Sequence, residues 1–345
     1  MKSTISIIVV AYNETKQLRT LKESVDRQVM SQHWRMETVL VDNGSSDGTT
    51  EVAVRMGFDK VIDCEGTIAA CRNAGYRVAA GEIIAYVDAD CELCDAWAGH
   101  VIAMIRDGSG LVGWPVEPPV PMTWVQEAWH AHWTNKRGHV DRMLSGEPAM
   151  TLITTANMSM TREVMERVGG FDESLRSGED MNFLLRAFRE GVELIASPYL
   201  KVIHHGEPRT LKAFYRQQKW HCSKSSFLRI LRSGSWRKGG NALLFTVANL
   251  FSLIFLLFGI VLTAVFGVFW YILLVFPYFL LVMIPATVIC VRSRSFRCYF
   301  SLILLYMTYG WVRVVDLLGL GVRSKSWRSD SGHKKHKKAQ KNNLG

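Results

Sequence analysis

Ile83-Ile84-Ala85-Tyr86-Val87-Asp88-Ala89-Asp90 is a stretch in which a short apolar run ends in two acids. An apolar run of this length, bounded by polar residues, is typical of a strand that is buried on both faces. Residues 5–10 form a similar run, followed by Ala11-Tyr12-Asn13-Glu14, and residues 37–41 precede Asp42 in the same way. These patterns predict neighbouring strands that each end in polar side chains.

Helical patterns separate these strands. They cover residues 18–29, 49–56 and 68–80, and a further short strand is expected at residues 61–63. Strands that alternate with helices predict an α/β fold, in which helices cover both faces of a parallel sheet. Because ligands bind such sheets beyond the carboxyl ends of the strands, the turns after the strands are candidates for one site.

The acids in these turns favour a divalent cation. Asp88 and Asp90 would repel each other unless a cation lay between them, and carboxylates suit Mg²⁺ and Mn²⁺. Such an ion, bound to a diphosphate, would neutralise a leaving nucleoside diphosphate. The alternative is that Asn43-Gly44 and Asp47-Gly48 are ordinary turns before a capped helix. Three acid-bearing turns on one edge of a sheet favour the metal site.

The polar turns resemble the successive motifs of family 2 glycosyltransferases with the GT-A fold. The resembling blocks are residues 6–14, 41–49, 71–75, 88–90, 169–173 and 178–180, and they span roughly residues 4 to 220. The resemblance implies a nucleotide-diphospho-sugar transferase-like fold, with a mixed, mostly parallel sheet. It also implies an inverting, metal-dependent hexosyltransferase that moves a sugar from a UDP- or GDP-sugar to a hydroxyl group.

The resemblance also assigns roles to individual residues. The implied donor-binding residues are Ala11, Asn13, Glu14, Asp42, Asn43, Arg72, Asn73, Asp88 and Ala89. The implied metal ligands are Asp88, Asp90 and His204, where His204 is preferred to His205 because of its offset from Pro198. Asn157 and Trp220 are further candidates on the acceptor or diphosphate side.

Glu179 and Asp180 are the predicted catalytic acids. A helix that begins at Ser177 or Gly178 would hold both in its first turn, where the helix dipole keeps a carboxylate ionised. An ionised carboxylate can take a proton from an attacking hydroxyl, and the resemblance implies that Asp180 is this base. The alternative is that the two acids only cap the helix.

Trp220 fits the end of the Gln-x-x-Arg-Trp motif of processive polysaccharide synthases, but Lys219 takes the place of the arginine and Gln217 lies one position after the place of the glutamine. Lysine lacks the planar two-point contact of arginine, so the sequence favours single additions, with processive synthesis as the alternative. A nucleotidyltransferase would need a glycine-rich loop after the first strand, and none follows it. A catalytically inactive membrane scaffold is the remaining alternative, and the retained acids argue against it.

A membrane region is predicted after the catalytic domain. Residues 242–291 contain no Asp, Glu, Lys or Arg, which suits two crossing helices, expected at 242–265 and 268–291. We therefore expect a catalytic domain at 1–208, amphipathic interfacial helices at 209–240, a membrane region at 241–322 and a basic disordered tail at 323–345. Arg313 and Asp316 interrupt a third apolar stretch, residues 299–322, which is expected to be re-entrant or interfacial.

The distribution of charged residues along the chain predicts the location of the protein and the partners that it binds. The net charge is +10, and residues 323–341 alone contain eight Lys or Arg and one Asp. Positive residues on both sides of the apolar run favour a helical hairpin in the cell membrane, with the catalytic domain in the cytoplasm. The expected partners are anionic lipids and a hydroxyl acceptor, such as a polyprenyl-linked one for cell-surface polysaccharide or glycolipid synthesis. Nucleic acid is not expected, because no aromatic-basic binding motif accompanies the charge.

Two further features have open interpretations. The seven cysteines are scattered, and Cys91-Glu92-Leu93-Cys94 has redox-motif spacing without a second pair to complete a zinc site. Four tryptophans lie between residues 114 and 150, where they could stack on an acceptor sugar or be buried in a helical insertion. Neither feature identifies the acceptor.

Overall fold

The computed structural model describes residues 2–137, 142–175, 177–221, 236–267, 273 and 276–318. The chain divides into two compact units. The first consists of Met1–Gln126 and His132–Glu207, and the second consists of Glu127–Ala131 and Pro208–Gly345. The first unit contains the polar turns, and the second contains the long apolar helices.

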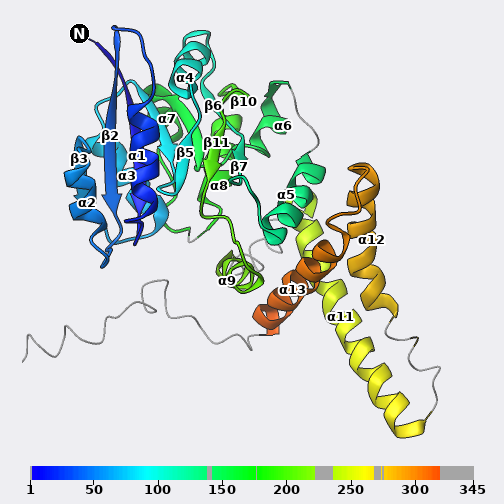
Figure 1. Cartoon of the computed structure of the whole chain (residues 1–345). Helices are drawn as coiled ribbons and strands as arrows, with labels where there is room; N and C mark the ends of the chain where they lie inside the picture. The colour runs from blue at the N-terminus through cyan, green and yellow to red at the C-terminus, as the bar shows by residue number, and fades with distance from the viewer. Residues whose placement is uncertain are drawn as a thin grey trace, which may run out of the picture. The chain divides into compact units, whose positions relative to one another are not determined.

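The first unit is built on an eight-stranded mixed sheet (Figure 1), with the strand order β3-β2-β1-β4-β9-β6-β10-β8. The strands are β1 (Ser3–Ala11), β2 (Trp34–Asp42), β3 (Lys60–Asp63), β4 (Ile83–Val87), β6 (Leu111–Gly113), β8 (Leu144–Ser145), β9 (Asn157–Thr161) and β10 (Leu194–Ala196). Strands β3, β2, β1 and β4 run parallel to one another, and β9 is antiparallel to both of its neighbours. The predicted mixed, mostly parallel sheet is confirmed.

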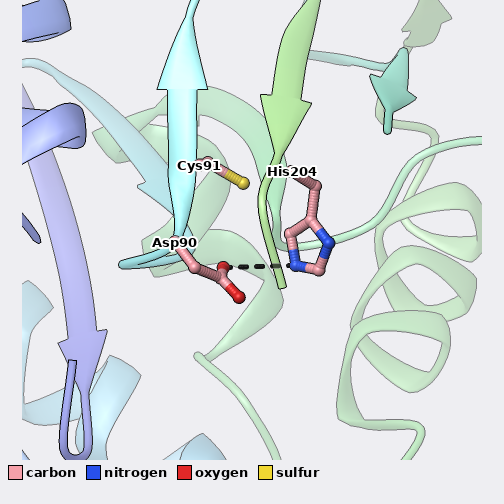
Figure 2. Close-up of side chains that lie close together, drawn as sticks. All are labelled: Asp90, Cys91 and His204. Atoms are coloured by element: carbon pink, nitrogen blue, oxygen red, sulfur yellow. Dashed lines mark ion pairs between the residues drawn. The ribbon is translucent and has the colours of Figure 1, made fainter. Parts of the chain in front are cut away.

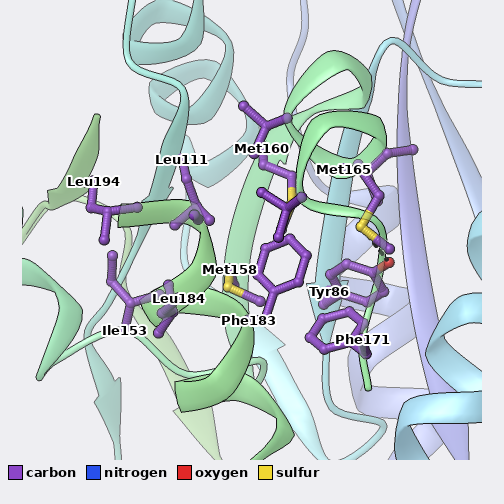
Figure 3. Packing of buried hydrophobic residues seen from close by; sticks show 14 of the residues in the cluster. Tyr86, Leu111, Ile153, Met158, Met160, Met165, Phe171, Phe183, Leu184 and Leu194 are labelled. Atoms are coloured by element: carbon purple, nitrogen blue, oxygen red, sulfur yellow. Dashed lines mark hydrogen bonds between the residues drawn. The ribbon is translucent and has the colours of Figure 1, made fainter. Parts of the chain in front are cut away.

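Helices cover both faces of this sheet because its central strands alternate between two apolar cores. On β1, Ile8 faces one core, whereas Ile7 and Val9 face the other. The first core includes residues of α3 (Ile68–Val78), α7 (Arg162–Val168) and α8 (Glu179–Arg189), and part of it is shown in Figure 3. The second core includes residues of α1 (Gln17–Asp26), α2 (Thr49–Arg55) and α4 (Trp97–Arg106). Each fully buried aliphatic side chain stabilises this arrangement by about 1.5–3 kcal/mol.

One glycine brings the helix α3 close to the sheet. A Cβ atom at Gly75 would lie 2.4 Å from Cγ2 of Ile8 and 3.0 Å from Cγ2 of Val41. Only glycine leaves room for this approach, and α3 carries Arg72 and Asn73 at the same time. The close packing of α3 therefore fixes the position of two predicted site residues.

A second, three-stranded sheet has the order β5-β11-β7, with β5 at Cys91–Leu93, β7 at Val116–Glu117 and β11 at Val202–His204. Strand β11 is antiparallel to β5 and parallel to β7. Because β5 begins directly after Asp90, this small sheet continues the chain from the end of β4 toward residues more than one hundred positions later in sequence. It is the element that joins the Asp-Ala-Asp turn to His204.

The first unit also contains the short helix α6 (Gly146–Met150) and most of α5 (Trp124–Arg137), whose residues Glu127–Ala131 belong to the second unit. The remaining helices are α9 (Leu211–His221), α11 (Trp236–Phe266), α12 (Phe276–Arg292) and α13 (Tyr299–Leu318). Helices α11, α12 and α13 pack against one another in pairs, and α13 also packs against α9.

Two described helices, at Leu244–Phe266 and Tyr299–Leu318, are long and apolar enough to cross a membrane by length and composition. The first lies where the first crossing helix was predicted. The predicted second crossing helix, 268–291, overlaps α12, which has 17 residues and contains Pro285. Residues 268–272, 274 and 275 lie outside the described part of the chain, as do 222–235 of the expected interfacial segment and the basic tail. The second of these helices is α13, which lies in the stretch that was expected to be re-entrant or interfacial.

Candidate active site

The ends of the first two strands form one wall of the site. The backbone N–H of Asn13 donates to Oγ of Ser45 at 2.8 Å, and Oδ1 of Asn13 accepts from the N–H of Ser46 at 2.9 Å. Oδ2 of Asp42 accepts from the N–H of Ser45 at 2.8 Å. Asn13 has a φ of 58°, a left-handed conformation that asparagine tolerates better than most residues. The turns after β1 and β2 are therefore tied together as one rigid edge.

Asn43 extends this wall to the third strand. Its N–H donates to the carbonyl of Ala11 at 2.9 Å, and its Oδ1 accepts from the N–H of Gly66 at 3.2 Å. In the strand register, Ala11 is level with Asp42, which is level with Asp63. The three parallel strands thus end together, as their polar turns predicted.

The Asp-Ala-Asp turn lies at the end of β4, beside His204. Pairing of β5 with β11 sets Cys91 opposite His204, and the N–H of His205 donates to the carbonyl of Asp90 at 2.8 Å. Figure 2 shows the result, with Nε2 of His204 3.2 Å from Oδ1 of Asp90. A Cβ atom at Gly206 would lie 1.8 Å from Oδ2 of Asp90, so glycine makes room for this carboxylate.

His205 points elsewhere, because neighbouring residues along an extended chain alternate in direction. Its Nε2 lies 3.1 Å from Oε2 of Glu92, and Glu92 also pairs with Arg27 at 3.0 Å. The structure thus places the imidazole of His204 beside Asp90 and that of His205 beside Glu92.

Negative charge accumulates on this edge of the sheet. Burial raises the pKa of Glu14 to about 7, and the charges of Asp90, Asp47 and Asp88 add to the effect. Burial raises the pKa of Asp88 as well, and the positive charge of the Arg72 guanidinium opposes this effect. The side chain of Asp88 stays 39% exposed. Burial would also raise the pKa of Asp90, but the hydrogen bond and the charge of His204 outweigh it and leave that pKa lowered. A cation at this edge would relieve the repulsion.

The donor atoms available here fit a hard divalent ion. One ligand atom from each of Asp90, Cys91 and His204 lies within 4.8 Å of the others. Burial raises the pKa of the Cys91 thiol well above its usual range, so the thiol stays protonated and is a poor ligand. Nδ1 of His204 is buried without a hydrogen-bond partner and lies 3.6 Å from Oε1 of Glu207. A carboxylate behind an imidazole is a common support for a metal-binding histidine.

The acceptor-side acids lie at the start of α8. The helix begins at Glu179 after Gly178, which has a φ of 76°, so both acids occupy its first turn as predicted. Oε1 of Glu179 lies 2.6 Å from Nη1 of Arg72, whose Nη2 lies 3.5 Å from Oδ1 of Asp88. Oδ1 of Asp180 accepts from the N–H of Met181 at 2.7 Å. Burial and the charge of Glu179 raise the pKa of Asp180, which makes its carboxylate a stronger base than a free aspartate.

Asn73, predicted near the donor, holds the loop that leads to α8. Its Oδ1 accepts from the N–H of Phe171 and its Nδ2 donates to the carbonyl of Phe171, both at 2.9 Å. Nδ2 also donates to Oε1 of Glu173 at 2.9 Å. The Phe171 ring stacks on Phe183 of α8 at a centroid distance of 4.7 Å. Sequence motifs gave no sign of this linkage, because its partners are about one hundred residues apart.

The structure disagrees with the placement of Asn157 on the acceptor or diphosphate side. Asn157 is fully buried, and its Oδ1 accepts from the indole N–H of Trp97 at 2.9 Å. Its Nδ2 donates to the carbonyls of Trp114, at 2.7 Å, and Leu200. These contacts satisfy the amide inside the fold, because a buried amide without partners would be costly. Asn157 is a core residue that joins three segments.

The remaining predicted residues are described by their burial and their packing contacts. Ala11 and Ala89 are buried, so they can offer a ligand little more than backbone. The side chain of Trp220 lies outside the described part of the structure. Trp114 is buried and Trp124 is 43% exposed, whereas Trp129 packs on Phe214 at 4.9 Å. All six described cysteines are free thiols, which fits the expectation of scattered free cysteines.

Sequence reasoning missed Ser45, Glu207 and Phe171. Ser45 lies within the resembling block 41–49, in which only Asp42 and Asn43 were assigned a role. Glu207 is three residues after His204, a spacing that offered a signal, and Phe171 lies within the resembling block 169–173, where no role was assigned to it. Each of the three positions another residue of the site.

Comparison with known proteins gives a consistent set of matches. The family model "Glycosyl transferase family 2" matches residues 6–169, and "Glycosyl transferase family group 2" matches residues 108–312. Glycosyltransferase AglE of Haloferax volcanii is 28% identical over 247 residues, which is 67% of this chain and 79% of that protein. O-antigen biosynthesis protein RfbC of Myxococcus xanthus is 27% identical over 58% of this chain, which spans 17% of that longer protein.

Among solved structures, mannosyltransferase PcManGT of Pyrobaculum calidifontis, in complex with GDP-Man and Mn²⁺, superimposes with a TM-score of 0.54 at 15% identity. The match covers 93% of this chain and 89% of that one. At this identity the likeness concerns the fold, and it agrees with the predicted GT-A architecture.

Proposed function

The chain belongs to glycosyl transferase family group 2, and from this premise we propose that it transfers a sugar from a UDP- or GDP-sugar to a hydroxyl group with inversion at the anomeric carbon. The observation that carries the proposal is the meeting of two acid pairs. Asp88 and Asp90 lie at the end of β4, Glu179 and Asp180 begin α8, and Arg72 lies between the pairs. One pair suits a donor diphosphate and its metal, and the other suits an acceptor hydroxyl.

The donor would be bound at the edge formed by the strand ends. Asp88, Asp90 and His204 would hold Mg²⁺ or Mn²⁺, which, when bound, neutralises charge on the leaving nucleoside diphosphate. The clustered negative charge and the position of Nε2 of His204, 3.2 Å from Oδ1 of Asp90, support this assignment. PcManGT, whose fold this chain shares, was solved with GDP-Man and Mn²⁺. Asn13 and Asp42, fixed by Ser45, would line the nucleoside side.

Asp180 would act as the general base. Glu179 is paired with Arg72 at 2.6 Å, whereas burial and the charge of Glu179 raise the pKa of Asp180 above its ordinary value, which strengthens its carboxylate as a base. The carboxylate of Asp180 would take the proton of the acceptor hydroxyl as its oxygen attacks the anomeric carbon and the bond to the diphosphate breaks. A single displacement of this kind inverts the configuration at that carbon.

We further propose a membrane location with the catalytic unit in the cytoplasm, and a lipid-linked acceptor. The two long apolar helices, Leu244–Phe266 and Tyr299–Leu318, support the location. A polyprenyl-linked acceptor agrees with this location, and the name of RfbC refers to O-antigen biosynthesis. Single additions are preferred to processive synthesis because Lys219 replaces the arginine of the processive motif.

A donor-turnover assay tests the proposal. Purified full-length protein, supplied with Mn²⁺ and a panel of UDP- and GDP-sugars, is expected to release nucleoside diphosphate from at least one of them. The double variant Asp88→Ala, Asp90→Ala is expected to lose this release. If the wild-type protein releases no nucleoside diphosphate from any donor, the chain is better described as an inactive scaffold.

A further inference from the structure

Two carboxylates of the site, those of Glu179 and Asp88, lie beside the guanidinium of Arg72. Arg72 is 6% exposed, and its guanidinium carbon lies 5.8 Å from the centre of the Phe171 ring. Its Nη1 is 2.6 Å from Glu179, and its Nη2 is 3.5 Å from Asp88. Its charge also lowers the pKa of Asp180, against the stronger effects of burial and Glu179. The buried guanidinium of Arg72 therefore interacts with acids on the donor side and on the acceptor side of the site.

The two ion pairs of Arg72 differ in length and in the exposure of the carboxylate partner. The pair with Glu179 has the length of a charge-assisted hydrogen bond, and the side chain of Glu179 is 11% exposed. The pair with Asp88 is longer, and the side chain of Asp88 is 39% exposed. Because the Glu179 carboxylate is engaged by the Arg72 guanidinium at 2.6 Å, it is not free to contact an acceptor hydroxyl. Its place beside Arg72 calls for another role.

We propose that Glu179 is a positioning residue that holds the Arg72 guanidinium away from Asp88 and so keeps the Asp88 carboxylate available for the metal ion. This inference rests on the proposed metal site. Without the charge of Glu179, Arg72 would be a buried cation that lacks its short ion pair, and such a group is costly. A movement of about 1 Å would turn its 3.5 Å contact with Asp88 into a direct hydrogen bond.

Without Glu179, the Arg72 guanidinium and the metal ion would compete for the Asp88 carboxylate. A guanidinium bonded to Asp88 would lower the affinity of that carboxylate for a metal ion, because the same lone pairs serve both. Glu179 thus couples the acceptor-side helix α8 to the donor side without touching either substrate. A role for Glu179 in proton transfer would lower turnover and leave metal binding unchanged.

Metal binding to full-length protein in the absence of donor separates these roles. Isothermal titration with Mn²⁺ is expected to show roughly tenfold weaker binding for Glu179→Gln than for the wild type, the effect of one neighbouring charge on a carboxylate. The matched control is Asp26→Asn, which removes an exposed acid paired with Lys22 on α1, outside the site. Its Mn²⁺ affinity is expected to equal that of the wild type.

A second variant tests the cause. Adding Arg72→Met to Glu179→Gln removes the competing cation and is expected to restore the Mn²⁺ affinity to within about threefold of the wild type. If Glu179→Gln does not fold, Glu179→Asp is the substitute, and its shorter side chain is expected to weaken Mn²⁺ binding in the same direction.

Two results would overturn the inference: wild-type Mn²⁺ affinity in the Glu179 variant, or no recovery in the double variant. A wild-type protein that binds no Mn²⁺ would instead overturn the proposed metal site itself, and the inference with it.

Discussion

Glu179 and Asp180 are adjacent in sequence, yet their surroundings differ. Glu179 is buried against Arg72, whereas Asp180 accepts from the N–H of Met181 in its own helix. The sequence predicted the pair and its position in the first turn of a helix, because helix-start signals are local. The pairing with Arg72 joins residues 107 positions apart, and no local pattern contains that information.

Substitution of the proposed base is expected to affect turnover more than donor binding. Asp180→Asn keeps the shape of the side chain but removes its ability to take a proton, so kcat should fall by about 10²–10⁴-fold with the donor KM little changed. Steady-state kinetics with varied donor concentration measures both parameters. Glu190→Gln, at the other end of α8, is the matched control, with kcat expected to stay as in the wild type. An Asp180→Asn enzyme within a few-fold of wild-type kcat would contradict the assignment.

Glu14 is expected to make stability depend on pH in metal-free protein. Its pKa of about 7 in the folded state exceeds the ordinary value of 4.5, so the folded protein holds this proton more tightly than the unfolded chain does. Stability from this group is therefore present below about pH 4.5 and is lost as pH rises through about 7.

Thermal unfolding in a chelating buffer tests this expectation. Glu14→Gln cannot ionise, so it should gain stability relative to the wild type between about pH 5 and about pH 8. An unchanged difference between the two proteins across this range would show that burial and the neighbouring acids do not raise the pKa of Glu14.

At the scale of elements, the pairing of β5 with β11 creates the candidate metal site. The sequence predicted Asp88 and Asp90 from the strand that precedes them, and His204 from its offset in a known motif. It did not predict the small sheet, because two- and three-residue strands are too short to show a period of two. The pairing of Cys91 with His204 across the two strands depends on tertiary contacts. This pairing places the imidazole of His204 beside Asp90.

Gly206→Ala is expected to damage this element without unfolding the protein. The added Cβ would meet Oδ2 of Asp90 at 1.8 Å, so the carboxylate must turn away from its present position. We expect at least tenfold weaker Mn²⁺ binding, with circular dichroism unchanged, because the clash involves a side chain at the edge of the fold. Gly99→Ala is a suitable control, since a Cβ there meets nothing within 4 Å. Normal Mn²⁺ affinity in Gly206→Ala would argue that Asp90 does not bind the ion.

The packing of α11 against α13 gives a second prediction at the scale of elements. Asn249 of α11 is fully buried, and a Cβ at Gly310 of α13 would lie 2.2 Å from its Oδ1. Close approach of helices at small residues stabilises helix pairs in membranes. Gly310→Leu is therefore expected to destabilise the second unit by about 1–3 kcal/mol, as other overpacked interfaces are. Chemical unfolding in detergent measures the change, and wild-type stability in this variant would contradict the close packing.

At the scale of the whole molecule, the chain joins a GT-A unit to a unit of apolar helices. The alternation of strands and helices was predictable because buried strands and polar strand ends recur in the sequence. The arrangement of the apolar helices was not predictable from sequence, since apolar composition gives length but not the path of a chain. The third apolar stretch was expected to be interfacial, and its described part, Tyr299–Leu318, is long and apolar enough to cross.

The central claim is metal-dependent, inverting sugar transfer with Asp180 as the base, and the configuration of the product tests it most directly. Proton NMR recorded during early turnover, before anomers of the released sugar equilibrate, reports the configuration when water takes the place of the acceptor. From an α-linked donor, we predict that the wild type releases the β-anomer first in the presence of Mn²⁺ and that Asp180→Asn releases almost none. First release of the α-anomer by the wild type would contradict the single displacement on which this account depends.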